Sequence, residues 1–246
     1  MGLTATTVGF LLLGMLVPRP AIAADVAVGL YFGKAFAMPG DVTVRRRGGR
    51  QDTYGEVIWY DESFTSPFYY SVRLIYWPDT DSNNGIALDF THAKLYSNLR
   101  DRITVTHSSA DGTRQTQQSL GDSFSRLAFS HGYNLLSLNM LHRSPAQNHD
   151  SHNEASVYVG AGIGVAVPHV EIQLADTLID HYKAVGLVFQ GMIGITLGTE
   201  TDLPLNAEYK YSYGNGSIEL ADDSTLEFSP QLHHFSVGPV IKQSKP

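Results

Sequence analysis

Side chains that bind metal ions or move protons recur at the ends of the apolar stretches of this chain. His92 and Lys94 lie near the end of the stretch GIALDFTHAKLY, which begins at residue 85. His131 comes just before another apolar stretch, and His169 and Glu171 end a third. Imidazole and carboxylate groups can together hold a divalent metal ion, and either group can act as a general acid or base. The elements that carry these residues decide whether they can meet.

Those elements are predicted to be β-strands, because apolar side chains alternate with small or polar ones. In residues 85–96, for example, Ile86 and Leu88 face one side and Asp89 faces the other. The segments are roughly 10 to 16 residues long, whereas strands of soluble proteins average about 5–6 residues and membrane-crossing strands need about 9–11. There are eight such segments, at 26–36, 68–77, 85–96, 133–142, 156–171, 182–198, 205–214 and about 229–241.

The connections between the segments differ in length, as they do in outer-membrane barrels, where periplasmic turns are short and external loops are long. With the N-terminus on the periplasmic side, the external loops are 38–67, 96–131, 169–181 and 214–228. The sequence therefore predicts an all-β fold, an eight-stranded antiparallel transmembrane β-barrel of the outer membrane.

A soluble eight-stranded barrel that carries a ligand is the alternative, and it would be apolar inside and polar outside. Here the less apolar face is mostly Gly, Ala, Ser and Asn, whereas a water-facing exterior would be richer in Lys and Glu. The charges on that face are two of each sign, which predicts an internal salt-bridge network with a structural role. Its members are Arg73, Asp89, Glu208 and Lys210.

The N-terminal residues are predicted to be an export signal. The apolar run at 7–17 is too short to span a bilayer comfortably, and small residues follow at Ala21 and Ala23, as at a signal-peptidase site. Residues 1–23 are therefore interpreted as a cleaved signal peptide, and residues 24–246 as a single barrel.

Composition limits the partners of this chain. The formal net charge is −7, which argues against a nucleic-acid partner, since phosphate binding needs a basic footprint. The absence of Cys excludes disulfides and thiolate zinc sites. The one basic run, RRRGGR at 45–50, is interpreted as a solvated loop, with contact to anionic head groups as the alternative. A closed barrel has no edge that demands a partner, so a monomer is expected.

The alternation places His92, Lys94, His169 and Glu171 on the lipid-facing side at the external rim, while the direction of His131 stays open. Such residues either form a metal or acid–base site or are ordinary interfacial groups. A lipid A deacylase would need a nucleophilic Ser two residues after its His, but Tyr133 occupies that position.

Five stretches taken together resemble the outer-membrane lipid A oxidases of alpha-proteobacteria. They are WYDESFTSPFYYSVRLIYWPD (59–79), GIALDFTHAKLY (85–96), FSHGYNLLSLN (129–139), GAGIGVAVPHVE (160–171) and AEYKYSYG (207–214). The resemblance covers most of the chain after residue 23. The polar loop at 97–128 is longer than this family leads us to expect and is interpreted as an insertion.

The resemblance implies an oxidase that uses dioxygen as co-substrate. It would convert the proximal glucosamine of lipid A lacking its 1-phosphate to 2-aminogluconate and release hydrogen peroxide. For this chemistry, His92 or His131 is the candidate base, and His169, Glu171 and another His are the candidate ligands of a divalent metal. Lys94 is the candidate that holds the remaining phosphate. The alternative is a non-catalytic barrel that serves as a structural anchor, an adhesin or a passage for small solutes.

Overall fold

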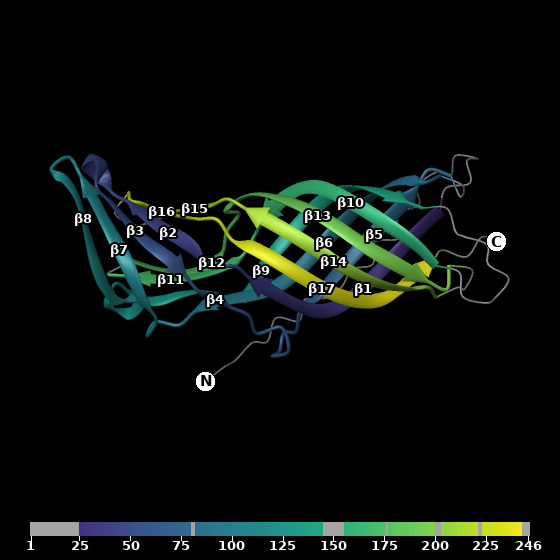
Figure 1. Ribbon diagram of the computed structural model, residues 1–246, viewed down its shortest axis with the longest axis horizontal. Coiled ribbons are helices and arrows are strands. Elements are labelled where there is room, and N and C mark those ends of the chain that lie inside the picture. The colour runs from purple at the N-terminus through teal and green to yellow at the C-terminus, as the bar shows by residue number, and fades with distance from the viewer. Residues whose placement is uncertain are drawn as a thin grey trace, which may run out of the picture.

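The computed structural model describes residues 25–79, 82–144, 155–175, 177–199, 203–220 and 223–242. Eight of its strands form a closed antiparallel barrel, in which β9 pairs with both β6 and β10 (Figure 1). The prediction of an eight-stranded antiparallel barrel is confirmed. The barrel strands are β1 (Asp25–Ala37), β5 (Tyr70–Trp77), β6 (Asn84–Ser97), β9 (Phe124–Arg143), β10 (Ala155–Ala166), β13 (Gly186–Leu197), β14 (Leu205–Gly214) and β17 (Gln231–Lys242).

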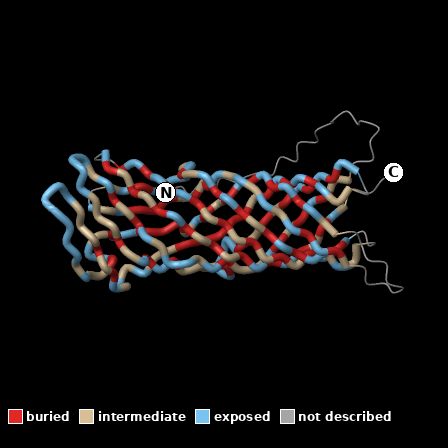
Figure 2. Tube along the Cα trace, turned by 45° about the horizontal axis from the view of Figure 1, so that its top comes forward, coloured by how far each residue is buried: buried red, intermediate tan, exposed pale blue. Residues whose placement is uncertain are grey.

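The period-two pattern sorts side chains to the two faces of the barrel wall, so that buried and exposed residues alternate along the strands (Figure 2). Many apolar side chains point outward, and examples that are 47% to 58% exposed are Phe32, Leu88, Leu138, Ile163, Phe189 and Val237. An apolar exterior around a polar interior is the arrangement of a barrel that crosses the outer membrane, and it is the reverse of a soluble ligand carrier. No helix among the described residues is long and apolar enough to span a membrane.

Glycine allows the wall to close where neighbouring backbones approach most tightly. A Cβ atom on Gly164 of β10 would lie 2.2 Å from the carbonyl oxygen of Leu136 and 2.6 Å from the Cα atom of Ser137, both on β9. Only a residue without a side chain fits there.

The external connections contain strands of their own, which differs from the prediction of long loops at 38–67, 96–131, 169–181 and 214–228. Apolar residues of these connections, such as Val42, Val44 and Leu226, are fully buried, so the short strands gain a core by packing together. Six strands form a second sheet in the order β15-β16-β2-β3-β7-β8, which lies beyond one end of the barrel (Figure 1). They are β2 (Gly40–Arg45), β3 (Gln51–Val57), β7 (Arg102–Ser109), β8 (Gly112–Ser119), β15 (Gly216–Glu219) and β16 (Thr225–Phe228).

Three further strands extend the barrel wall outward. β11 (His169–Leu174) pairs with the outer part of β9, β12 (Thr177–Tyr182) pairs with β11, and β4 (Trp59–Tyr60) pairs with β6. Two short 3-10 helices complete the described elements, η1 (Arg47–Gly49) and η2 (Leu120–Asp122).

An aromatic cluster joins the second sheet to the barrel. The ring of Phe129 on β9 lies 5.5 Å from that of Trp59, 5.5 Å from that of Tyr133 and 5.0 Å from that of Phe228 on β16. These residues belong to one buried core that continues from the second sheet into the outer part of the barrel. The predicted signal peptide, residues 1–23, lies outside the described residues.

Candidate functional site

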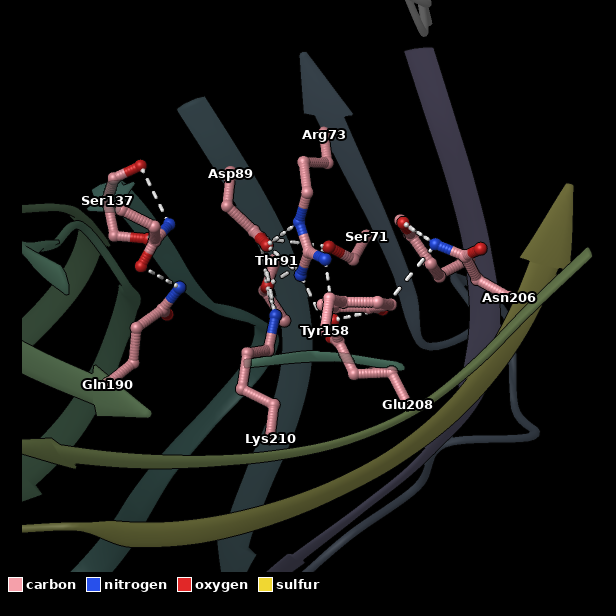
Figure 3. Close-up of polar contacts among 12 residues, drawn as sticks. Ser71, Arg73, Asp89, Thr91, Ser137, Tyr158, Gln190, Asn206, Glu208 and Lys210 are labelled. Carbon is pink, nitrogen blue, oxygen red and sulfur yellow. Dashed lines mark hydrogen bonds and ion pairs between the residues drawn. The ribbon is translucent and has the colours of Figure 1, made fainter. Parts of the chain in front are cut away.

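The four interior charges meet inside the barrel (Figure 3). Arg73 donates from Nε to Asp89 at 2.8 Å and from Nη2 to Glu208 at 2.9 Å, and Lys210 donates to Asp89 at 3.2 Å. Arg73, Asp89 and Lys210 are each 1% exposed and Glu208 is 6% exposed. Side chains therefore fill the barrel at this level. Each charge has a partner, as buried charges require, and this fits a structural role.

The structure brings together His131, His169 and Glu171 just outside the barrel. β9 continues past the barrel as far as Phe124, and its outer part pairs with β11, which sets Glu171 opposite Ala128. His131 Nδ1 lies 2.6 Å from Glu171 Oε1, and His169 Nδ1 lies 3.3 Å from the same oxygen. Residues from two of the sequence stretches quoted above thus form one cluster.

Gly132 lets β9 turn beside this cluster. Its φ of +123° lies in a region that side chains disfavour, and a Cβ atom there would meet the ring of His92 at 2.5 Å. The missing side chain of Gly132 therefore leaves room for the ring of His92 next to the backbone that carries His131.

Glu171 is the electrostatic centre of the cluster. Its side chain is fully buried, accepts a hydrogen bond from Ser130 Oγ at 2.6 Å and forms an ion pair with Arg126. Burial alone would raise the pKa of Glu171, but the hydrogen bonds from Ser130 and His131 and the charge of Arg126 lower it to about 2. Glu171 is therefore a carboxylate at neutral pH and can bind a proton donor or a cation.

The three side chains fit a metal ion by their chemistry and spacing. One ligand atom from each of His131, His169 and Glu171 lies within 4.8 Å of the others. Two imidazoles and one carboxylate are the ligand set of non-haem iron enzymes that use dioxygen. Arg126 already neutralises part of the Glu171 charge, which would weaken metal binding but leaves both imidazoles as donors.

His92 and Lys94 are not among the ligand atoms of the cluster and are covered, which differs from the predicted lipid-facing rim. His92 is 5% exposed. Its ring stacks on Tyr70 at 5.1 Å, and its Nδ1 lies 2.8 Å from Asn134 Oδ1. Its Nε2 has no hydrogen-bond partner among the described residues. His92 keeps a free nitrogen, but the ring is not open to lipid.

Lys94 is also 5% exposed, because the chain between β4 and β5 lies over it. Its Nζ donates to the carbonyl oxygens of Thr65 and Ser66 at 3.0 Å each and lies 3.7 Å from Glu62. The prediction that Lys94 faces a lipid phosphate is therefore corrected. A cation open beside the cluster is Arg126, whose side chain is 46% exposed and which lies within the loop predicted at 96–131.

A hydrolytic triad is not formed at this site. Ser130 Oγ lies 3.4 Å from His131 Nδ1, and Glu171 Oε1 lies 2.6 Å from that same nitrogen. In a triad, the nucleophile and the acid bind opposite nitrogens of the imidazole. The geometry therefore gives no support to a deacylase, in agreement with the sequence.

No protein-family model and no curated protein matches this chain. Similar solved structures include Neisserial surface protein A, with 11% identity over 89% of this chain and 97% of that chain and a TM-score of 0.43. The outer membrane protein AlkL, studied in DMPC lipid bilayers, is 15% identical over 100% of this chain and 98% of that chain, with a TM-score of 0.44. Ail of Yersinia pestis is 11% identical over 87% and 97%, with a TM-score of 0.28. Identities this low transfer no activity to this chain.

Proposed function

We propose that this protein is an outer-membrane oxidase of lipid A. It would convert the proximal glucosamine of lipid A lacking its 1-phosphate to 2-aminogluconate, with dioxygen as oxidant and hydrogen peroxide as the other product. The observation that carries the proposal is the cluster of His131, His169 and Glu171 at the outer rim. Its two imidazoles and one carboxylate are suited to dioxygen chemistry.

The height of the cluster above the membrane agrees with a sugar substrate. His131 is 62% exposed and lies five residues beyond Leu136, an outward apolar residue of the same strand. Five residues span about 17 Å of strand, or about 13 Å along the membrane normal for a strand tilted by about 40°. His131 therefore lies about 13 Å farther from the membrane centre than Leu136, on the head-group side of the outward apolar residues.

The reaction removes two electrons and two protons from the anomeric carbon and its hydroxyl group, and dioxygen takes up both to give hydrogen peroxide. The resulting lactone adds water to give the acid. His131, His169 and Glu171 would hold a redox-active metal ion, which would supply the electron-transfer chemistry toward dioxygen. His131, which is 62% exposed, is the candidate acceptor of the hydroxyl proton when it is not a ligand. His92 Nε2 lacks a partner among the described residues but is buried, so it would have to be uncovered to take that role. Arg126 is the candidate that holds the remaining phosphate.

The test is the mass of lipid A from cells that make it without the 1-phosphate and express this chain. The expected result is the gain of one oxygen atom, and only when dioxygen is supplied. An unchanged mass with the barrel folded in the membrane would reject the oxidase and favour the non-catalytic anchor or adhesin. The filled interior around Arg73 disfavours the solute-passage alternative.

Single substitutions distinguish the loss of the candidate site from a general effect on the barrel. Glu171→Gln and His169→Ala should abolish the mass change, while His142→Ala should leave it intact, because His142 lies at the opposite end of β9 and is exposed. Exhaustive chelation should also abolish it. Full activity after chelation and in His169→Ala would discard the metal.

A further inference from the structure

Residues 61–69, termed the Phe64 loop, connect β4 to β5 and carry two aromatic side chains that the protein leaves uncovered. Phe64 is 72% exposed and Phe68 is 57% exposed. Neighbouring large apolar side chains exposed to this degree mark a contact surface. At a membrane interface, such aromatic side chains are favourable rather than costly.

Lys94 shows on which side of the wall the Phe64 loop lies. Its neighbours Ala93 and Leu95 belong to the buried core. The Lys94 side chain therefore leaves β6 on the opposite face, that of Leu88 and Phe90, although the pairing of β6 with β9 shifts register at this point. Because its Nζ donates to the carbonyls of Thr65 and Ser66, the loop must lie against the outside of the rim and not over the barrel opening. In Figure 1, the chain that follows β4 leaves the side of the barrel.

The loop is held in this position by several contacts. Ser63 Oγ accepts the backbone N–H of Ala35 on β1 at 3.1 Å and donates to Asp61 at 2.8 Å. The N–H of Tyr69 donates to the carbonyl of Ser63 at 2.8 Å. The two phenylalanines are therefore presented by a braced segment.

The apolar surface of the loop continues the lipid-facing belt. Phe36 on β1 is 44% exposed, and the ammonium group of Lys34 lies 4.6 Å from the centre of its ring. Lys34 also lies 3.6 Å from Asp61 of the loop. A lysine beside aromatic rings is a combination that membrane interfaces favour, so the continuity of this surface points to lipid as the occupant.

We propose that the Phe64 loop is a membrane anchor that inserts Phe64 and Phe68 at the boundary between head groups and acyl chains of the outer leaflet. The hydrogen bonds from Lys94 to Thr65 and Ser66 fix the loop in that position. The proposal does not depend on the oxidase activity.

The test uses the absence of Cys from this chain, which lets a nitroxide spin label be placed at one position at a time. The variants are Phe64→Cys, with Met140→Cys as the reference in the lipid belt and Thr113→Cys as the reference in water. Met140 is 75% exposed on the outward face of β9, and Thr113 is exposed on β8. Each labelled protein is reconstituted into phosphatidylcholine vesicles, and label collisions are measured with oxygen, which concentrates in lipid, and with a nickel chelate, which stays in water.

The ratio of oxygen to nickel collisions at position 64 should be several-fold above that at position 113 and approach that at position 140. A ratio equal to that at position 113 would overturn the anchor. Protection from both reagents would also overturn it, because another protein copy would then cover the loop.

The role of Lys94 in fixing the loop is tested by Lys94→Met in the Phe64→Cys protein. The label should become more mobile and more accessible to nickel, while the barrel keeps its folded migration in unheated gels. Lys242→Met is the matched control, because Lys242 also donates to a carbonyl, that of Thr199, at the other end of the barrel. A label that responds to neither substitution, or equally to both, would reject the role of Lys94.

Discussion

At Glu171, one buried carboxylate meets Arg126, Ser130 and His131 from β9 and His169 from its own strand. These contacts hold the outer part of β9 against β11 as well as grouping the two imidazoles. Glu171 therefore contributes both to local stability and to the proposed chemistry. The pH dependence of unfolding measures the stability contribution by itself.

The first prediction concerns this carboxylate below neutral pH. Its folded-state pKa of about 2 lies below the ordinary value of 4.5, so its contribution is complete above about pH 4.5 and is lost as pH falls toward about 2. A shift of this size corresponds to at most about 3 kcal/mol, less any screening at the partly exposed Arg126. Urea unfolding in lipid vesicles should show wild type losing its free-energy advantage over Glu171→Gln between about pH 4.5 and about pH 2.

Glu227→Gln is the control for this measurement. Glu227 also pairs with an arginine, Arg45, but both side chains are exposed, so its effect should stay below about 1 kcal/mol at either pH. A pH-independent difference between wild type and Glu171→Gln would contradict the assignment.

At the scale of elements, the barrel depends on how closely its strands approach. β10 meets β9 at Gly164 with no room for a side chain, whereas Gly191 on β13 has only one atom, a carbonyl oxygen at 3.9 Å, near the place of its missing Cβ. A side chain is therefore excluded at Gly164 but has room at Gly191.

The second prediction compares these glycines. Gly164→Val should push β9 and β10 apart and cost about 3 kcal/mol, the upper end for overpacking, and the folded band in unheated gels should weaken or disappear. Gly191→Val should migrate as the folded wild type does. Equal tolerance at both positions would show that the contact between β9 and β10 is looser than the structure has it.

The elements also show why the barrel could be predicted from the sequence and the external part could not. Strands such as β13 and β17 are 12 residues long, so their alternation is unambiguous, whereas β15 and β16 have four residues each and cannot be told from loops by period. The predicted strand at 156–171 is in fact two, because β10 ends at Ala166 and β11 begins at His169. Both pair with β9, but the other neighbour is β13 for β10 and β12 for β11.

The candidate site was partly predictable for the same reason. The ends of apolar stretches indicated His131, His169 and Glu171, because strand ends gather at one rim. Alternation could not show that the Phe64 loop covers Lys94, or that Arg126 reaches Glu171, because both contacts depend on how the connections fold.

At the scale of the whole molecule, the second sheet and the barrel share one core, and Phe129 lies at their junction. Its ring is fully buried and lies against three aromatic rings, those of Trp59 on β4, Phe228 on β16 and Tyr133 on β9 itself. The external sheet is therefore part of the folded unit and not a loosely attached cap.

The third prediction follows from that junction. Phe129→Ala should cost about 3–5 kcal/mol and loosen the second sheet before the barrel. Limited proteolysis should then cut the chain within 38–57 or 102–119 while the barrel fragment stays protected. Phe189→Ala is the matched control, since Phe189 is half exposed on the lipid-facing wall. Equal resistance of wild type and Phe129→Ala to protease would contradict this role.

The buried ion pairs of Arg73 and Lys210 connect strands across the barrel interior, and close-packed interiors resist compression. Lateral pressure in the bilayer, or a change in its thickness, should therefore tilt the whole cylinder and leave its cross-section unchanged. The spacing between β9 and β11 at the rim would then stay the same in membranes of different composition.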